Sequence, residues 1–271
     1  MLDYLAIGHI AQDITPNGIR LGGTVAYAAL TAHALGLRTG VVTAAAPGAV
    51  TDGLERLTLH CLPSPRSTTF ENKYGPNGRT QTLHAQAGPL TFDSVPAEWR
   101  AAPIVHLAPI AREVDADLAN RFSSALVCLT PQGWMRQWDG AGRVSKSKWE
   151  SAESALKSAT ATVISIEDVS GDRDLIEHWA GIANIFVVTE GGNGATVFQR
   201  GSRYHVPAPA VAEVDATGAG DIFAASFFVR FWQTRNVLES ARFAVALASD
   251  SITRVGIDGV PKQDSISNTQ Y

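Results

Sequence analysis

The sequence predicts an α/β protein with a mostly parallel sheet and helices on both faces of that sheet. The first observation is that short β-type runs alternate with helical patterns along most of the chain. This alternation is typical of βαβ units, whose crossover helices cover a parallel sheet from both sides and give three layers. The second is the length of 271 residues, which is enough for one large α/β domain with a substantial core. The third is that two turn-rich segments break the rhythm and predict a small additional β-sheet.

Each main element follows from its own local pattern. Residues 4–7 form a buried-type strand that ends at Gly8. Thr24 is placed to cap a helix over 24–35, and Gly36 is placed to end it. Further strands are predicted at 40–43, 104–107, 125–129, 162–166, 185–189 and 203–206. Further helices are predicted at 114–122, 149–158, 173–183, 222–233 and 238–254.

The two segments that break the rhythm read as β-hairpins. Residues 11–21 contain Pro16-Asn17-Gly18, a turn signal between short apolar runs. Residues 67–90 contain Gly75-Pro76-Asn77-Gly78 between two stretches of alternating sequence. Two alternatives stay open at this point. The segments form one small sheet that stands off the main domain, or they are separate surface hairpins.

Composition excludes several classes of protein. The net charge is −4 and the basic residues form no run, so a nucleic-acid binder is not expected. No apolar run approaches the ~20 residues that a membrane helix needs. Cys61 and Cys128 stand in apolar surroundings and are predicted as core residues. Two cysteines give no disulfide framework, so we expect a soluble cytoplasmic protein.

The segment 215–221, DATGAGD, is the strongest chemical signal in the chain. It is a glycine-rich turn that leads into an apolar helix, and such a turn exposes backbone N–H groups that bind an anion. Gly218 and Gly220 let phosphate oxygens approach because they lack a Cβ. A lone aspartate here would more often be a helix cap. Asp221, however, shares the turn with the anion site, which is what phosphoryl transfer needs.

Other glycine-rich and catalytic motifs are absent from the sequence. The chain has no G-x-x-x-x-G-K-[ST] P-loop, no G-x-S-x-G elbow and no H-E-x-x-H. Phe223 stands where a dinucleotide-binding motif would carry its third glycine. The seven histidines are dispersed, so a zinc site is not expected.

The segment VDATGAGDIFAASF resembles the C-terminal signature of the ribokinase-like carbohydrate kinases of the PfkB type. Three more matches extend the resemblance over nearly the whole chain: the glycine pair in GGTVAYAAL, the turn in VTEGGNGA, and the C-terminal GIDGVP. The resemblance implies a three-layer α/β/α sandwich over 1–271, with a β-sheet lid built from about 11–22 and 67–90. It implies ATP and Mg²⁺ as cofactors and leaves a monovalent cation open. Lids of this type often pair between subunits, so it also suggests a homodimer.

The resemblance assigns roles to individual residues. Asp221 would be the general base, with the anion hole formed by Gly218, Ala219 and Gly220. Asp13, Gly22 and Gly23 would contact the acceptor. Asp215 would organise the loop, a role compatible with an ordinary loop cap. The nucleotide would lie against Asp168, Thr189, Gly191, Gly192, Gly194, Thr217 and Ala248. For the glycines and Ala248, a plain turn and close helix packing are the alternatives.

Two departures from the family pattern bear on the acceptor and the metal. Tyr27 replaces the asparagine that usually binds sugar, and it would either stack on a flat ring or fill the helix face. Ser165 replaces the asparagine of the N-x-x-E pattern, so Glu167 or Asp168 would hold Mg²⁺ through water. Gln132 and Arg136 follow a strand end, where a substrate could bind. These features look closest to the branch of the myo-inositol kinases. A nucleoside or vitamin-precursor kinase and a non-catalytic sensor remain the alternatives.

Overall fold

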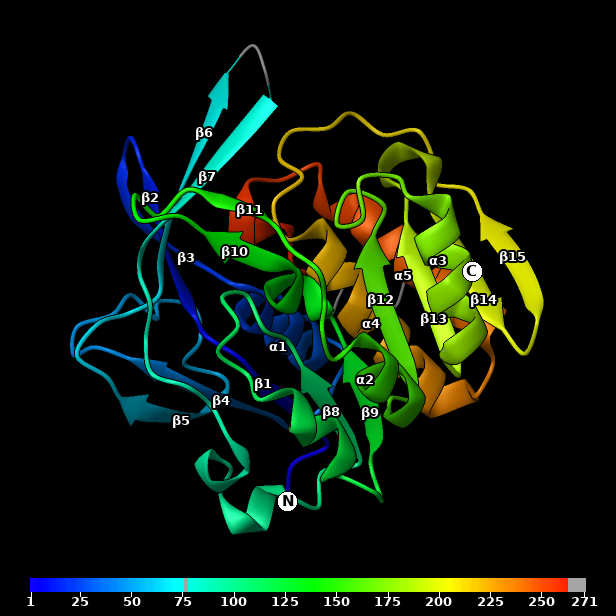
Figure 1. Cartoon of the computed structure of the whole chain (residues 1–271), viewed down its shortest axis with the longest axis horizontal. Helices are drawn as coiled ribbons and strands as arrows, with labels where there is room; N and C mark the ends of the chain where they lie inside the picture. Colours follow the sequence, from blue (N-terminus) through cyan, green and yellow to red (C-terminus); the bar gives the residue numbers. More distant parts are fainter. Residues whose placement is uncertain (76–77, 263–271) are drawn as a thin grey trace.

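A computed structural model describes residues 1–75 and 78–262 of the chain. Its centre is a nine-stranded sheet in the order β15-β14-β13-β12-β9-β8-β1-β4-β5 (Figure 1). The strands of this sheet are β1 (Tyr4–Ile7), β4 (Thr39–Ala45), β5 (Thr58–Pro63), β8 (Ile104–Leu107), β9 (Leu126–Leu129), β12 (Ala161–Ser165), β13 (Ile185–Thr189), β14 (Ala195–Gln199) and β15 (Ser202–Val206).

The sheet is parallel from β5 to β13, and the two pairings at one edge, β13 with β14 and β14 with β15, are antiparallel. Strand β1 shows why these strands lie in the interior. Tyr4 and Ala6 pack into one hydrophobic cluster, whereas Leu5 and Ile7 pack into a second cluster on the other face. A strand that is apolar on both faces fits only between two covering layers.

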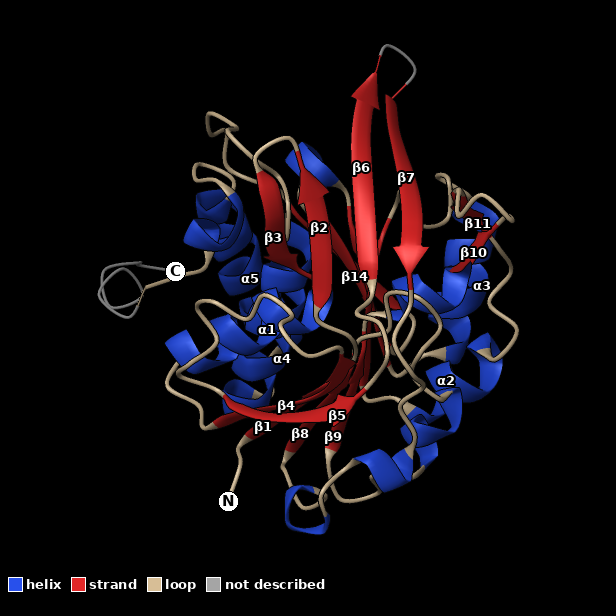
Figure 2. Cartoon of the chain, turned by 90° about the vertical axis from the view of Figure 1, so that its left-hand side faces the viewer, coloured by secondary structure: helices blue, strands red, loops and turns tan. Residues whose placement is uncertain are grey.

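Helices provide those two layers. On one face lie α1 (Thr24–Ala34), α4 (Ala219–Thr234) and α5 (Val237–Ser251), and α4 packs closely against both α1 and α5. On the other face lie α2 (Ala152–Ser158) and α3 (Arg173–Ile182) (Figure 2). The predicted three-layer α/β/α fold is therefore confirmed.

The two segments that break the rhythm pair with each other in one small sheet. Its strands are β2 (Ala11–Thr15), β3 (Gly18–Gly22), β6 (Thr69–Gly75) and β7 (Gly78–Ala85), in the order β3-β2-β6-β7. The two hairpins join through a parallel pairing of β2 with β6, and the sheet stands away from the main one (Figure 2). We call it the lid sheet. The predicted turn residues Pro76 and Asn77 lie outside the described part of the chain.

A third hairpin was not anticipated from the sequence. Strands β10 (Arg136–Trp138) and β11 (Val144–Lys146) pair in antiparallel fashion, and the connection between them reaches the lid sheet. There the Leu83 N–H donates to the Gly142 carbonyl over 2.8 Å. The hairpin therefore joins the lid sheet to the segment that follows β9.

Two predictions about local structure are wrong. The helix expected over 114–122 is only a short 3-10 helix, Ala116–Asn120, capped by the Asp115 side chain. Cys61, predicted to be buried, is exposed because β5 is the edge strand of the main sheet, whereas Cys128 is fully buried. Among the described helices, none has the length and apolar character needed to cross a membrane.

Candidate active site

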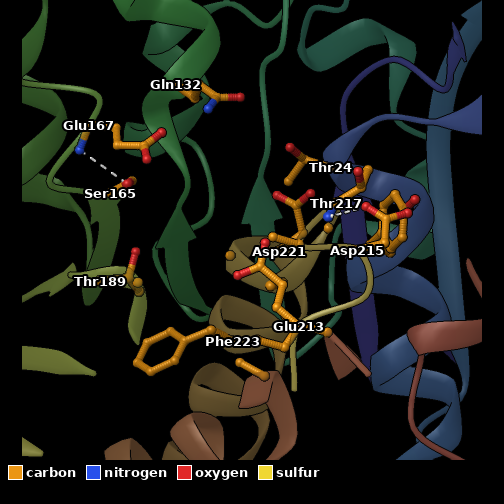
Figure 3. A pocket seen from close by; sticks show the side chains of 18 of the residues that line it. Thr24, Gln132, Ser165, Glu167, Thr189, Glu213, Asp215, Thr217, Asp221 and Phe223 are labelled. Atoms are coloured by element: carbon orange, nitrogen blue, oxygen red, sulfur yellow. Dashed lines mark hydrogen bonds between the residues drawn. The ribbon is translucent and has the colours of Figure 1, made fainter. Parts of the chain in front are cut away.

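A large pocket opens where the parallel strands end, between the main sheet and the lid sheet, with a volume of about 1160 Å³ (Figure 3). Ligands of open α/β sheets bind at this edge because the strand ends leave a crevice there. The pocket brings together residues that are far apart in the sequence. Its lining includes Asp13, Gly23, Tyr27, Gln132, Arg136, Glu167, Asp168, Thr189, Gly191, Gly192, Gly194, Thr217, Gly218, Ala219, Gly220, Asp221 and Ala248.

The turn that begins α4 has the geometry of an anion site. Gly218 is the N-cap in the left-handed conformation, with φ 79°. Within the described residues, the amides of Gly218 and Gly220 have no backbone acceptor, whereas the Ala219 N–H donates to the Ala216 carbonyl over 3.2 Å. Unpaired amides at a helix start attract an anion, and the helix dipole adds to this attraction. Two of the three predicted donors are thus unengaged by the backbone.

Asp215 holds this turn in place from one side. One of its carboxylate oxygens accepts from the Thr217 N–H and the other from the Gly256 N–H, each over 2.9 Å. Burial raises the pKa of Asp215, but the hydrogen bonds from Thr217 and Gly256 and the charge of Arg20 outweigh it and lower the pKa. Asp215 is therefore a charged clamp that joins the turn to the C-terminal loop, as the loop-organising prediction requires.

Asp221 lies in the first turn of α4 and is partly buried. Removal from water raises the pKa of its carboxyl to about 6. A hydrogen bond with the Thr24 side chain and the charge of Arg136 favour the ionised form, and the Asp168 carboxylate disfavours it. Thr24 lies beside the Asp221 carboxyl in Figure 3. A carboxylate with a pKa near neutrality is suited to accept a proton at physiological pH.

The lid sheet supplies one wall of the pocket. Asp13, Phe70, Asn72 and Gln81 all line it, and the Gln81 amide donates to the Asn72 side-chain oxygen over 3.0 Å. Gly22 does not line the pocket. A Cβ at Gly22 would lie 2.0 Å from an Asp13 carboxylate oxygen, so this glycine makes room for that side chain. Its predicted role as an acceptor contact stays a prediction, and its observed contact is with Asp13.

Gln132 and Arg136 come from the segment that follows β9, as the strand-end argument predicts. The Gln132 amide donates to Asp168 over 3.2 Å. Arg136 donates to the Ile110 carbonyl over 3.0 Å and stands above the Phe70 ring, 5.6 Å from its centroid. This cation faces the pocket between the lid sheet and the Asp221 carboxyl.

The opposite end of the pocket is glycine-rich and partly apolar. The turn after β13 carries Gly191, Gly192 and Gly194, and a Cβ at Gly194 would lie 2.1 Å from the Val206 carbonyl oxygen. Helix α5 contributes Val245 and Ala248, and Ile252 follows at its C-cap. Small and apolar residues therefore line this part of the pocket.

Glu167 and Asp168 are the acidic pair that could hold a metal. Asp168 accepts from the Ser165 N–H over 2.9 Å; burial raises its pKa, while hydrogen bonds and nearby cations oppose this shift. Among the described residues, no group of three or more metal-ligating side chains comes together. Two carboxylates at a pocket edge fit Mg²⁺, which keeps several waters and takes further ligands from substrate phosphates.

Several lining residues were not singled out from the sequence. Thr24 was expected only as a helix cap, yet its side chain interacts with Asp221. Asn72 and Gln81 belong to the hairpin predicted over 67–90, for which the sequence does not indicate which face covers the site. Side chains two residues apart on a strand point to the same side, so Phe70 and Asn72 of β6 share one face. This alternation predicts that Asn72 lines the site once the lid sheet is known to cover it.

Comparisons with known proteins agree with this geometry. Residues 153–263 match the model of the pfkB family carbohydrate kinases. The chain is 25% identical to a cytidine kinase of Thermococcus kodakarensis over 94% of this chain and 98% of that protein. It is 26% identical to a fructokinase of Rhizobium leguminosarum bv. trifolii, and the match covers 81% of this chain and 76% of that protein.

A solved structure extends the comparison to the fold. A pyrophosphate-dependent kinase of the ribokinase family, complexed with a pyrophosphate analogue and myo-inositol, superposes with a TM-score of 0.81. The two chains are 24% identical, and the match covers 92% of this chain and 94% of that one. This similarity shows that the two proteins share a fold.

Fold and site together define a phosphotransferase that acts on the hydroxyl of a sugar or nucleoside. The match of residues 153–263 to the pfkB family model agrees with the resemblance to the ribokinase-like carbohydrate kinases that the C-terminal signature predicts. The alternative of a non-catalytic sensor is set aside.

Proposed function

We propose that this kinase transfers the terminal phosphoryl group of ATP to a hydroxyl of a small sugar or polyol, with Asp221 as the general base. The observation that carries the proposal is the place of Asp221. Asp221 directly follows Gly220, whose amide has no backbone acceptor among the described residues. Both residues line a pocket whose opposite wall carries Asp13. A base and an anion site that share one helix start can serve the two ends of a phosphoryl transfer.

The reaction follows from these positions. Asp221 accepts the proton of the acceptor hydroxyl as the hydroxyl oxygen forms its bond to the γ-phosphorus. The bond from that phosphorus to the leaving oxygen breaks, and ADP departs. The amides of Gly218 and Gly220 stabilise the charge on the transferring group. Glu167 and Asp168 would hold Mg²⁺ through water, and the bound ion would supply charge neutralisation for the donor phosphates.

The acceptor side favours a polyhydroxylated compound. Asp13 accepts hydrogen bonds and donates none, which suits hydroxyl groups. The Asn72 and Gln81 amides beside it both donate and accept. The structural neighbour that binds myo-inositol supports a polyol. The relative named cytidine kinase supports a second candidate, a nucleoside, which would use the same base and the same turn.

The donor side favours ATP over pyrophosphate. One part of the pocket, which we call the slot, is lined by Gly191 and Gly192, by Val245 and Ala248 of α5, and by Ile252 at the C-cap of α5. Pyrophosphate has no ring to fill such a slot, whereas adenine would bury apolar surface in it. The neighbour that uses pyrophosphate makes this donor the alternative to test.

The experiment is a matrix of donors and acceptors with purified protein and Mg²⁺. ATP and pyrophosphate are each offered with myo-inositol, ribose, fructose and cytidine, and product is measured by mass spectrometry. The proposal expects the highest kcat/KM for ATP with a sugar or polyol. Highest turnover of cytidine would make the nucleoside the acceptor. Transfer from pyrophosphate alone would overturn the donor assignment.

We expect Ala248→Trp to weaken ATP use selectively. The indole would fill the slot beside the glycine turn, so KM for ATP should rise roughly 10- to 100-fold, equivalent to about 1.4–2.7 kcal/mol. KM for the acceptor should stay within a factor of about two, since the lid wall is untouched. Initial-rate kinetics measure both constants. Ala246→Trp, on the same helix outside the pocket, is the control, and an equal rise there would contradict the slot.

We expect kcat/KM to fall as the pH drops below about 6. The pKa of Asp221 is raised to about 6, and a protonated carboxyl cannot accept the proton of the hydroxyl. Rates between pH 4.5 and 8.5, with saturating Mg²⁺ and a check of folding at each pH, measure the profile. A rate that stays flat down to pH 4.5 would show that the essential base is another group.

A further inference from the structure

The Tyr27 ring lies directly beneath the anion turn. Tyr27 is on α1 and only 3% exposed, packed in a cluster with Ile222, Phe243 and Leu247. A Cβ on Gly218 would lie 2.3–2.6 Å from three atoms of the Tyr27 ring. The ring therefore contacts the backbone of Gly218, the N-cap residue of α4. This burial favours the alternative in which Tyr27 fills the helix face; Tyr27 also lines the pocket, so stacking on an acceptor stays a prediction.

The same helix reaches the base. Thr24 lies three residues before Tyr27, so the two side chains share one face of α1. The Thr24 side chain interacts with the Asp221 carboxyl, and Figure 3 shows the two groups side by side. One turn of α1 thus contacts both parts of the site, the anion turn through Tyr27 and the base through Thr24.

The start of α1 is itself fixed in place. Gly23 is the N-cap of the helix, with φ 92°, and a Cβ there would lie 2.7 Å from the His9 carbonyl oxygen and 2.8 Å from the Ala11 N. Helix α1 also packs along α4, on which Asp221 lies. A rigid helix with a fixed start can hold two groups at a constant separation.

We propose that Thr24 and Tyr27 are positioning residues that set the place of the Asp221 carboxyl relative to the Gly218–Gly220 amides. This inference rests on the proposed function and names how its geometry is maintained. The base must meet the acceptor oxygen while the amides meet the phosphoryl oxygens, so their separation decides the rate. A misplacement of about 1 Å can cost about 100-fold in rate.

The surroundings of Tyr27 argue against a role for its phenol as an acid. Burial raises the pKa of Tyr27, and the carboxylates of Asp221, Asp13 and Asp215 raise it further, opposed only in part by Arg20. The hydroxyl therefore stays neutral. What Tyr27 contributes is the shape and the rigidity of its ring.

The test compares Tyr27→Phe, Tyr27→Leu and the control Phe243→Leu, which changes the same cluster away from the turn. Each is assayed with ATP and the best acceptor among myo-inositol, ribose, fructose and cytidine. We expect Tyr27→Phe to keep kcat within about 3-fold. We expect Tyr27→Leu to lose about 100-fold in kcat with both KM values nearly unchanged. Phe243→Leu should lower the melting temperature without changing kcat.

Other outcomes overturn the proposal. A rise of 10-fold or more in the acceptor KM for Tyr27→Phe would make Tyr27 a substrate contact. An unchanged kcat for Tyr27→Leu would make the ring ordinary core. If Tyr27→Leu fails to fold, Thr24→Val decides. Removal of its hydrogen bond should move the acid limb of the pH–rate profile to higher pH, because that bond favours the ionised form of Asp221. An unmoved limb in that variant would overturn the proposal. An inactive wild type would instead refute the proposed function.

Discussion

Asp221→Asn is expected to lower kcat by about 10²–10⁴-fold, the range for loss of a positioned general base. Asparagine has the same size and shape as aspartate but cannot accept the hydroxyl proton at neutral pH. The anion turn keeps its geometry, since Gly218 and Gly220 are unchanged. The affinity for ATP should therefore stay within a few-fold of the wild type. Single-turnover kinetics measure the loss of rate, and equilibrium titration with a non-hydrolysable ATP analogue measures the affinity.

The same variant should be more stable than the wild type above pH 6. The folded-state pKa of Asp221, about 6, is higher than the ordinary aspartate value of 3.8. Between these values the folded state holds more protons than the unfolded state, so stability falls as the pH rises through this window. Above pH 6 the wild type carries the full cost of a desolvated charge, and the variant does not. Melting temperatures at pH 4 and pH 8 measure the difference, and near-wild-type turnover by the variant would remove Asp221 from its proposed role.

Gly218→Ala is expected to damage the anion turn. Its φ of 79° is unfavourable for any residue with a Cβ, and the added methyl would lie 2.3 Å from the Tyr27 ring. Backbone strain of this kind costs about 1–3 kcal/mol, and relief of the clash must move the turn or the ring. Loss of one anion-hole donor lowers kcat by about 10²–10³-fold. Thermal denaturation and initial rates measure the two effects.

Gly36→Ala is the matched control for this variant. Gly36 has φ 89° at the end of α1, and nothing lies within 4 Å of a Cβ built there. An alanine at this position has the cost of the left-handed backbone conformation, but its methyl group meets no neighbouring atom and lies far from the pocket. We expect a loss of stability with unchanged kcat. A similar kcat for both variants would show that the contact between Gly218 and Tyr27 has no catalytic consequence.

Local pattern predicts seven of the nine strands of the main sheet, and β5 and β14 have no counterpart among the predicted strands. Residues 4–7, 104–107 and 185–189 form strands with the predicted bounds. The expected helix over 114–122 fails because Asp115 caps a 3-10 turn and the chain then turns back at Phe122 toward β9. The β10–β11 hairpin gives no clear signal, since each of its strands has only three residues and their pairing reaches across Gly140 and Gly142.

The candidate site is predictable from the sequence where its aspartates and its anion-binding backbone lie in one short segment. The turn at 215–221 shows its glycines, its aspartates and its place before an apolar helix directly in the sequence. Tyr27 and Thr24 could not be assigned in this way. Their contacts depend on how α1 docks against α4, which is set by packing between segments almost 200 residues apart. The sequence therefore indicates the candidate reacting groups, but not the residues that we propose to hold them.

The two walls of the pocket come from segments that lie far apart in the chain. The proposed base, the anion turn and the proposed donor loops fall within 153–263, the stretch that matches the family model, whereas the lid sheet comes from the first third of the chain. On the proposed function, a change at Asn72 or Gln81 is expected to alter which alcohol is taken up and to leave the phosphoryl chemistry intact. New substrate preferences could then be engineered by exchanging two short hairpins.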